Sequence, residues 1–262
     1  MILDDKKVLV ACNTLTSING DIYQNHASFY YRLGKDHPDY TFHMLFSRRL
    51  SIDRFRNNAV KTANELGCRW LLFIDDDMKL PRETFLKLMQ GIEAGYGIVG
   101  AFNYIRGYPY QLMVFKYREG TRKLVNIKEE DILPQIEAGD LIDCDAIGTA
   151  VCIIDMKVVN NTGAPWFVTG PYSTEDIYFC LKATDANPGL RIGTHCGIQT
   201  GHMLEPELIN YKTRPHLKAY EESYMTGYEK DTQTTGDRGA GYIKDVVEPM
   251  LGALAEIHAK VP

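Results

Sequence analysis

The sequence predicts an α/β fold built on a mostly parallel central sheet with flanking helices. Two observations predict it. Short, continuously apolar runs are typical of strands buried on both faces, and the segments between them carry apolar residues at helical spacing. The 262 residues suit one large domain, or one domain with an appendage, and can bury a sizeable core. With 45% apolar residues, the composition is not that of a disordered chain.

The first hundred residues alternate between the two patterns. Buried strands are predicted at 7–12, 40–46, 70–74 and 97–101, and helices at 21–33 and 51–66, the second ending at Gly67. A third helix is expected to open at Pro81, because proline suits a first helical turn, and its apolar stripe is Phe85, Leu88, Met89 and Ile92. Strands that alternate with helices in this way are expected to run parallel.

After residue 108 the pattern changes to short strand-like runs separated by turns, at 112–117, 123–127, 141–146 and 150–154. A helix at 174–184 and a strand at 191–198 follow. Residues 228–240 lack apolar anchors and are expected to form a mobile loop. From Tyr242 onward one long helical stripe is predicted, which either docks on its own domain or makes a homodimer contact.

Composition and terminal sequence exclude several classes. The longest apolar runs, such as 70–74, are far shorter than the roughly 20 residues of a membrane-spanning helix. The chain passes from Met1 to charged residues within three positions, so no secretory signal is expected. The six scattered cysteines are expected to be buried, reduced thiols of a cytoplasmic protein. The net charge of −5 argues against a broadly basic nucleic-acid-binding protein.

Three consecutive carboxylates, Asp75, Asp76 and Asp77, follow the apolar run 70–74. They stand at the carboxyl end of a predicted strand, where open α/β sheets bind ligands. Adjacent carboxylates repel one another, and a divalent cation relieves that repulsion, although an acidic start to the next helix is an alternative. No GxxxxGK[ST] motif is present, which excludes a P-loop NTPase. The run 95–100 fits GxGxxG only at a helix-to-strand junction, the wrong place for a dinucleotide fingerprint.

Three segments, taken in order, resemble the GT-A class of nucleotide-sugar glycosyltransferases, especially small family-2-like enzymes of bacteria and phages. They are Arg56-Asn57-Asn58-Ala59 with 72–81; 146–154 with 165–167 and 174–180; and Gly201-His202-Met203. The resemblance implies a GT-A-like (Rossmann-like) catalytic domain at 1–204, with a nucleotide-binding half at 1–102 and an acceptor half at 103–204. Residues 205–262 have no counterpart in the resemblance and are expected to form a C-terminal lid and helix extension. The resemblance also implies that the cytoplasm is that of a bacterial cell or a phage-infected host.

The resemblance also implies a metal site. Asp75 and Asp77 correspond to the DxD pair: Asp77 binds the cation that bridges the donor's two phosphates, and Asp75 reaches the ribose or the metal. His202 resembles the histidine that completes the metal shell, and this ligand set suits Mn²⁺, with Mg²⁺ as the competing option. Taken alone, His202 is more simply a structural or exposed histidine, and a zinc site with His195 and Cys196 is disfavoured by its spacing.

Further residues are expected around the donor. The resemblance implies that the nucleotide sugar contacts Thr14, Arg54, Arg56, Asp75, Asp76, Gly148 and Trp166. Arg56 would offer a guanidinium fork to the diphosphate or the base, with a solvated basic face as the alternative for Arg54 and Arg56. Trp166 would offer a stacking face to a sugar or base, or else belong to the core.

Glu175 and Asp176 begin the helix predicted at 174–184. The resemblance makes Asp176 the general base that deprotonates the acceptor in an inverting displacement, with Glu175 as the second catalytic candidate. Capping of the helix N-terminus is the alternative role for both carboxylates.

Together these features favour a metal-dependent glycosyltransferase of hexosyltransferase type that uses a nucleotide-diphosphate sugar, with a UDP-sugar preferred, and a hydroxyl acceptor. A metal-dependent nucleotidyltransferase or phosphohydrolase is the main alternative, and a silent carbohydrate-binding relative is disfavoured by the intact Asp75, Asp77 and His202. The acceptor is a saccharide, a polyol-phosphate, a small molecule or, less favoured given the net charge, a hydroxymethylated base in DNA. The basic residues Lys212, Arg214 and Lys218 are expected to contact phosphate, with a solvated surface near a flexible tail as the alternative.

Overall fold

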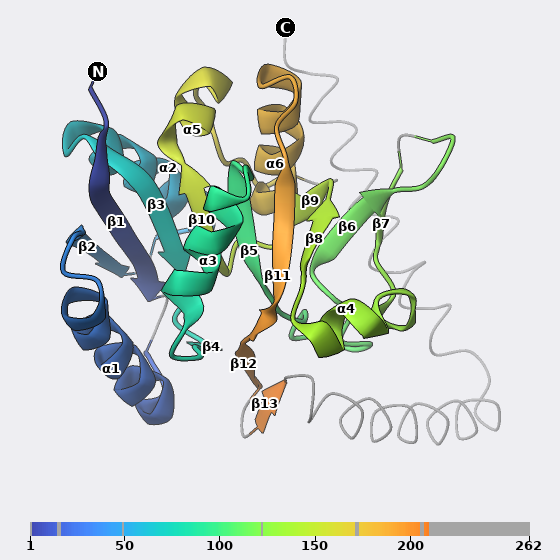
Figure 1. The fold of residues 1–262 in the computed structure, drawn as a ribbon, viewed down its shortest axis with the longest axis horizontal. Coiled ribbons are helices and arrows are strands. Elements are labelled where there is room, and N and C mark those ends of the chain that lie inside the picture. Colours follow the sequence, from blue (N-terminus) through green and yellow to red (C-terminus); the bar gives the residue numbers. More distant parts are fainter. Residues whose placement is uncertain are drawn as a thin grey trace, which may run out of the picture. The chain divides into compact units, whose positions relative to one another are not determined.

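A seven-stranded mixed sheet forms the centre of the fold, in the order β2-β1-β3-β10-β5-β11-β8 (Figure 1). Its strands are β1 (Asp4–Thr14), β2 (Thr41–Arg48), β3 (Cys68–Ile74), β5 (Ile98–Phe102), β8 (Leu141–Cys144), β10 (Val151–Asp155) and β11 (Ile192–Gln199). β1, β2, β3, β5 and β11 share one direction, and β10 and β8 run antiparallel to their neighbours. The predicted α/β class with a mostly parallel sheet is confirmed.

This computed structural model describes residues 2–14, 17–48, 50–121, 123–170, 173–204 and 207–209, the last of these by backbone alone. All of them belong to one unit, Met1–Arg214. The expected loop at 228–240, the helical tail with its possible dimer contact, and Lys212, Arg214 and Lys218 lie outside the described residues. The division at 1–204 and 205–262 therefore stays a prediction. Within the described part, no helix is long and apolar enough to span a membrane.

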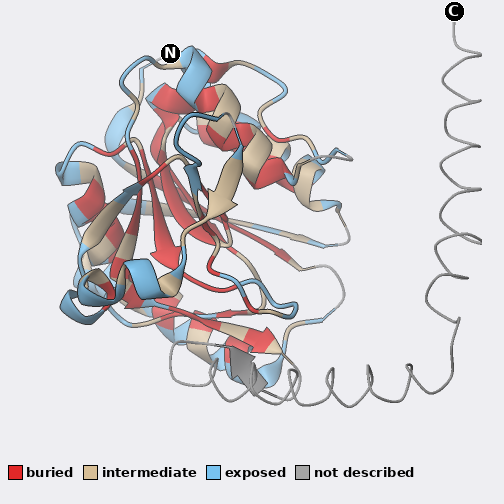
Figure 2. Cartoon of the chain, turned by 90° about the vertical axis from the view of Figure 1, so that its right-hand side faces the viewer, coloured by how far each residue is buried: buried red, intermediate tan, exposed pale blue. Residues whose placement is uncertain are grey.

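Helices pack on both faces of the sheet, so its central strands are buried on both sides (Figure 2). One face carries α1 (Gly20–Asp36) and α3 (Thr84–Glu93), and the other carries α2 (Ile52–Glu65), α5 (Met156–Thr162) and α6 (Glu175–Ala186). Every residue of β3 is buried, which is why its sequence is apolar apart from Arg69, which forms an ion pair with Asp155. The six cysteines are buried free thiols, as predicted.

Two three-stranded sheets accompany the central sheet. β4 (Met78–Lys79) pairs with β12 (Gly201–Leu204), which pairs with β13 (Glu207–Ile209). β6 (Val114–Tyr117) pairs with β7 (Leu124–Asn126) and with β9 (Ala146–Ile147). The short helix α4 (Leu133–Ala138), preceded by the 3₁₀ turn at Glu129–Asp131, leads into β8.

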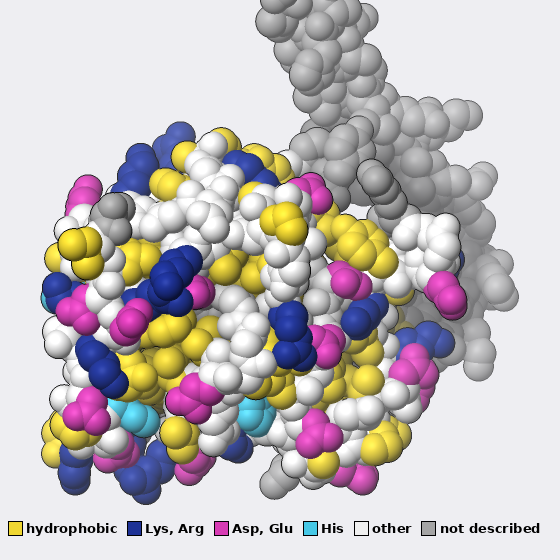
Figure 3. Space-filling view, turned by 45° about the horizontal axis from the view of Figure 1, so that its top comes forward, with side chains coloured by type: hydrophobic (Ala, Val, Ile, Leu, Met, Phe, Trp, Pro, Cys, Tyr) yellow, Lys and Arg dark blue, Asp and Glu magenta, His cyan; other side chains and the backbone are white. Residues whose placement is uncertain are grey.

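Some boundaries differ from the prediction. The helix expected at Pro81 begins at Thr84, because the Pro81 carbonyl oxygen accepts a hydrogen bond from the Thr84 hydroxyl (2.7 Å) in a turn before the helix. The run 141–146 is broken at Asp145, whose amide bonds to Phe115, so it forms β8 and β9 in different sheets. On the face in Figure 3, acidic and basic side chains are interspersed with apolar ones.

Candidate functional site

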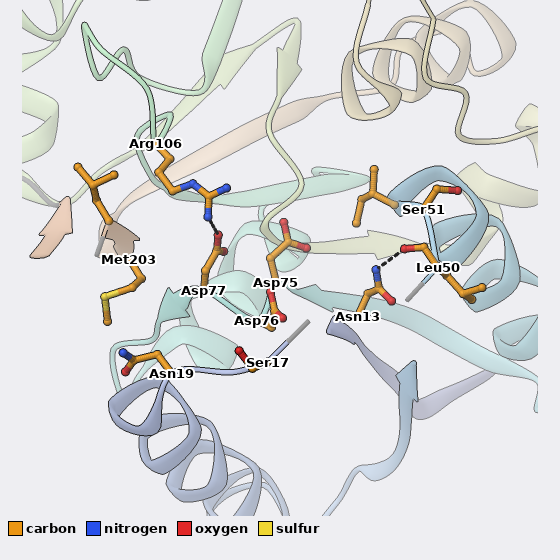
Figure 4. Close-up of a pocket in the computed structure, with 12 residues that line it drawn as sticks. Asn13, Ser17, Asn19, Leu50, Ser51, Asp75, Asp76, Asp77, Arg106 and Met203 are labelled. Atoms are coloured by element: carbon orange, nitrogen blue, oxygen red, sulfur yellow. Dashed lines mark hydrogen bonds and ion pairs between the residues drawn. The ribbon is translucent and has the colours of Figure 1, made fainter. Parts of the chain in front are cut away.

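A cavity of about 740 Å³ opens where the chain leaves β1, β2, β3 and β5 (Figure 4). Most of its lining residues are polar or charged, and they come from loops that are distant in sequence. They are Asn13, Ser17, Asn19, Leu50, Ser51, Ile52, Asp75, Asp76, Asp77, Arg106, Met203 and Leu204. A cavity of this size at the carboxyl ends of parallel strands can hold a drug-sized or nucleotide-sized ligand.

The turn that carries the three aspartates is fixed from several sides. Asp75 donates its amide to the Ala150 carbonyl (2.7 Å), and the Asp77 carbonyl accepts from the Met203 amide (2.8 Å). On the opposite side, His26 of α1 donates from Nε2 to the Met78 carbonyl oxygen (2.7 Å), and the Asn25 side chain bonds to both the amide and the carbonyl of Leu80. These backbone contacts leave the carboxylates facing the cavity.

Asp77 lines the cavity and is in contact with His202, which is not a lining residue and lies 125 positions away in the sequence. His202 Nε2 lies 3.1 Å from Asp77 Oδ2, and His202 Nδ1 donates to the Tyr104 carbonyl oxygen (2.8 Å). Burial alone would lower the pKa of His202, but the hydrogen bond and charge of Asp77 outweigh it and raise that pKa. Burial likewise opposes ionisation of Asp77, but His202 and Arg106 together hold its pKa below the ordinary value.

Arg106 is a cavity residue that the sequence analysis missed. Its Nη1 donates to Asp77 Oδ2 (3.0 Å), the oxygen that also faces His202. Arg106 lies in the loop between β5 and β6, which the sequence marks only as a turn region. Because no periodicity or motif surrounds it, its contact with Asp77 required the three-dimensional fold.

Asp75, by contrast, faces a buried ionic cluster. Arg56 of α2 reaches Asp75 Oδ2 with Nη2 (3.4 Å) and Glu175 Oε1 with Nη1 (2.9 Å), and it also hydrogen-bonds to Thr149. Burial raises the pKa of Asp75 to about 7, even though the charge of Arg56 opposes that shift. For Arg56, burial would lower the pKa, but Asp75 and Glu175 outweigh it and raise it. Arg56 therefore belongs neither to a solvated face nor to the cavity lining.

The two carboxylates at the start of α6 have different partners. Glu175 is paired with Arg56, whereas Asp176 accepts hydrogen bonds from the Thr174 hydroxyl and from the Ile177 amide (2.8 Å). Both side chains are largely buried, and neither lines the described cavity. Of the two, it is Glu175 that forms the ion pair with Arg56.

Asn13 is a second cavity residue that the sequence analysis missed, next to the predicted Thr14. Its Nδ2 donates to the Leu50 carbonyl oxygen (3.0 Å), which fixes the orientation of the amide. Its Oδ1 is buried and has no hydrogen-bond partner among the described residues. A buried acceptor without a partner is costly, so a ligand that donates a hydrogen bond there would be favoured.

Besides Arg56, four predicted donor contacts do not line the cavity. Thr14 is half-buried at the end of β1, and Arg54 is exposed on α2. Gly148 packs against Met113, and a Cβ at Gly148 would lie 3.0 Å from that side chain. Trp166 packs beside α5, donating from Nε1 to the Val159 carbonyl oxygen (3.0 Å). Their proposed roles toward a donor stay predictions.

The predicted metal ligands are gathered only in part. Among the described residues, no group of three or more His, Cys, Asp or Glu side chains is arranged to hold a metal ion. The Asp77 and His202 side chains nevertheless suit a metal ion. Because the Nδ1–H of His202 is bonded to the Tyr104 carbonyl oxygen, the lone pair of His202 Nε2 faces a carboxylate oxygen of Asp77. Such a contact needs a proton or a cation between the two atoms, and a backbone carbonyl on the far nitrogen is typical of metal-bound histidines.

No protein-family model and no curated protein matches this chain. Among solved structures, its fold is similar to that of A197 from STIV, with 18% sequence identity, coverage of 78% of this chain and 93% of that one, and a TM-score of 0.52. At this identity the likeness shows the α/β fold alone.

Two weaker likenesses are to GalNAc-T7, solved with UDP, GalNAc and Mn²⁺, and to residues 1–349 of S. aureus TarS. GalNAc-T7 is 11% identical, with 76% of this chain and 44% of that one covered and a TM-score of 0.47. TarS is 15% identical, with 72% and 57% covered and a TM-score of 0.42. The matches thus span about half of the GalNAc-T7 chain and about half of the TarS chain. Their TM-scores are too low to support a conclusion about this protein.

Proposed function

We propose that the protein is a metal-dependent glycosyltransferase of GT-A type that moves a sugar from a nucleotide-diphosphate sugar, preferably a UDP-sugar, to a hydroxyl acceptor. One observation carries the proposal. The acidic turn Asp75-Asp76-Asp77 lines a cavity of about 740 Å³, the distant His202 contacts Asp77, and their segments occur in the order that resembles GT-A enzymes. The A197 likeness adds the fold class and nothing about activity.

Asp77 and His202 are the residues proposed to hold a divalent cation, Mn²⁺ or Mg²⁺. When bound, the cation supplies positive charge to the phosphates of the leaving nucleoside diphosphate. Two protein ligands are sufficient, since such cations are commonly held by one or two carboxylates together with substrate phosphates and water. Asp75 is proposed to act from beside this pair, since its carboxylate is engaged by Arg56.

The nucleoside is proposed to occupy the part of the cavity lined by Asn13, Ser17 and Ser51. Asn13 Oδ1 is an acceptor without a described partner, and the ring N–H of uracil is a donor of matching chemistry. This supports a uracil nucleotide, although guanine and thymine also carry a ring N–H and belong in the same test.

Asp176 is proposed as the general base that takes the acceptor proton, in a displacement that inverts the anomeric centre. Glu175 is neutralised by Arg56, so of the two carboxylates Asp176 is the better placed to accept a proton. The acceptor is proposed as a saccharide, a polyol-phosphate or a small molecule. The DNA acceptor depends on residues outside the described part and has no support from the site.

The test is a thermal-shift panel of UDP-, GDP- and dTDP-sugars with and without Mn²⁺, because a ligand that binds the native state raises Tm. We expect one sugar nucleotide to raise Tm only with the metal present, and Asp77→Asn to abolish that rise. Chromatography of the products then identifies the bond that breaks.

Release of the nucleoside diphosphate supports glycosyl transfer. Release of a nucleoside monophosphate with a sugar phosphate would instead identify a phosphohydrolase, and no metal-dependent shift with any donor would contradict the proposal.

A further inference from the structure

Arg106 sits on a loop whose base is fixed and whose tip is exposed. Backbone hydrogen bonds join Ile105 to Gln111 (2.8 Å) and Met113 to Asn103 (3.0 Å), and Tyr104 pairs with Leu112 as an isolated bridge. Tyr104 and Leu112 are buried, which anchors the loop to the domain. The Arg106 side chain is 58% exposed and reaches over the cavity to Asp77 (Figure 4).

Arg106 is also the only Lys or Arg among the described residues that line the cavity, where three aspartates lie. It bonds to Asp77 Oδ2 at 3.0 Å, and His202 faces the same oxygen at 3.1 Å. A divalent cation held between Asp77 and His202 takes the place of the proton between them and lies next to the Arg106 guanidinium. Because like charges this close repel one another, the cation favours departure of the guanidinium from Asp77.

The displaced guanidinium has an obvious new partner. A nucleotide-sugar diphosphate beside three aspartates adds negative charge to a cavity that already has an excess of it. Arginine binds phosphate oxygens through two parallel hydrogen bonds, and an exposed side chain can turn toward them at little cost in solvation.

We propose that Arg106 is a built-in counter-cation of Asp77, which leaves that carboxylate when a divalent cation binds and then binds the diphosphate of the donor. The inference rests on the proposed function, since it needs both a metal and a diphosphate in the cavity. Arg106 then has two opposing effects: it weakens binding of the metal ion and strengthens binding of the nucleotide.

Arg106→Gln tests this, because glutamine keeps hydrogen-bonding capacity and removes the charge. The control is Arg82→Gln, since Arg82 forms a similarly exposed ion pair with Asp36, with 61% of the arginine side chain exposed against 58% for Arg106. Calorimetry measures Mn²⁺ affinity without nucleotide, and then UDP and GDP affinity at saturating Mn²⁺.

For Arg106→Gln we expect Mn²⁺ to bind about tenfold more tightly than to wild type, and the nucleoside diphosphate to bind about tenfold more weakly. Arg82→Gln is expected to match wild type in both measurements. If wild type binds Mn²⁺ and a nucleotide but Arg106→Gln behaves like Arg82→Gln, the exchange is wrong and the proposed function stands. If wild type binds neither Mn²⁺ nor a nucleotide, both proposals fail.

Discussion

Two aspartates of the same turn each form an ion pair with an arginine, and one of these arginines is buried whereas the other is exposed. Arg56, with 3% of its side chain exposed, lies 3.4 Å from Asp75. Arg106, with 58% exposed, lies 3.0 Å from Asp77. The shorter contact is thus the one at the surface, so distance alone does not say which ion pair is permanent.

The difference in burial gives the two pairs different properties. A buried guanidinium has lost its hydration, and the carboxylates of Asp75 and Glu175 compensate for that loss by pairing with it. An exposed guanidinium regains water when it leaves its partner, so breaking that pair costs little. The Arg56 cluster is therefore suited to hold α2, β3 and α6 together, and the Arg106 pair is suited to exchange with ligands.

The largest expected effect tests the buried cluster. Arg56→Met should lower the free energy of unfolding by about 3–5 kcal/mol, because Asp75 and Glu175 are left without their cation. Denaturant unfolding followed by circular dichroism measures this. Arg54→Met changes an exposed arginine on the same helix and should stay within about 0.5 kcal/mol of wild type. Equal stability of the two variants would contradict a structural role for Arg56.

The next effect separates the two carboxylates at the start of α6. Asp176→Asn should lower turnover by about 10²–10⁴-fold and leave donor affinity unchanged, since only the destination of the acceptor proton is lost. Glu175→Gln should mainly cost stability, because it weakens the pair with Arg56. Turnover and donor binding are measured for both variants beside their melting temperatures. Full turnover of Asp176→Asn would remove it as the base.

A third prediction concerns the exposed side of the turn. Asp77→Asn should weaken Mn²⁺ binding, and with it UDP binding, on the order of 100-fold, because an amide oxygen is a poorer ligand for a hard cation than a carboxylate. His202→Ala should weaken Mn²⁺ about tenfold, since Asp77 and the donor phosphates remain. Calorimetry before and after removal of metal by a chelator measures both. A Mn²⁺ affinity in His202→Ala equal to that of wild type would exclude His202 as a ligand.

Most of the fold was predictable because its signals are local. Continuous apolar runs placed β1, β3 and β5, and the strand at 150–154 was placed as well. The antiparallel direction of β10 was not predicted, since direction depends on partners far along the chain. The helix α5 was missed because its seven residues are too few to show a helical period, although Asp155 caps it through the Lys157 amide (2.7 Å).

Residues of the site were predictable only where the sequence immediately around them is enough to indicate a site. Asp75, Asp76 and Asp77 follow one strand, so the sequence alone pointed to them. Burial of Arg56 had a usable signal, since Arg56, Ala59, Val60 and Ala63 share one helical face and all are buried. The sequence around Asn13 and Arg106 carried no signal for the site. Asn13 is oriented by Leu50 and Arg106 contacts Asp77, and both partners are distant in the sequence.

The smallest expected effect compares the two arginines directly. Arg106→Gln should change the free energy of unfolding by less than about 1 kcal/mol, because the side chain is more than half exposed and its pair with Asp77 is screened by water. The same denaturant measurement as for Arg56→Met gives the value on one scale. Because raising the salt concentration screens exposed pairs, the stability difference between Arg106→Gln and wild type should shrink further in concentrated salt, whereas that for Arg56→Met should persist. A loss in Arg106→Gln as large as that in Arg56→Met would mean that the Asp77 pair is structural, and a permanent pair could not give way to a cation.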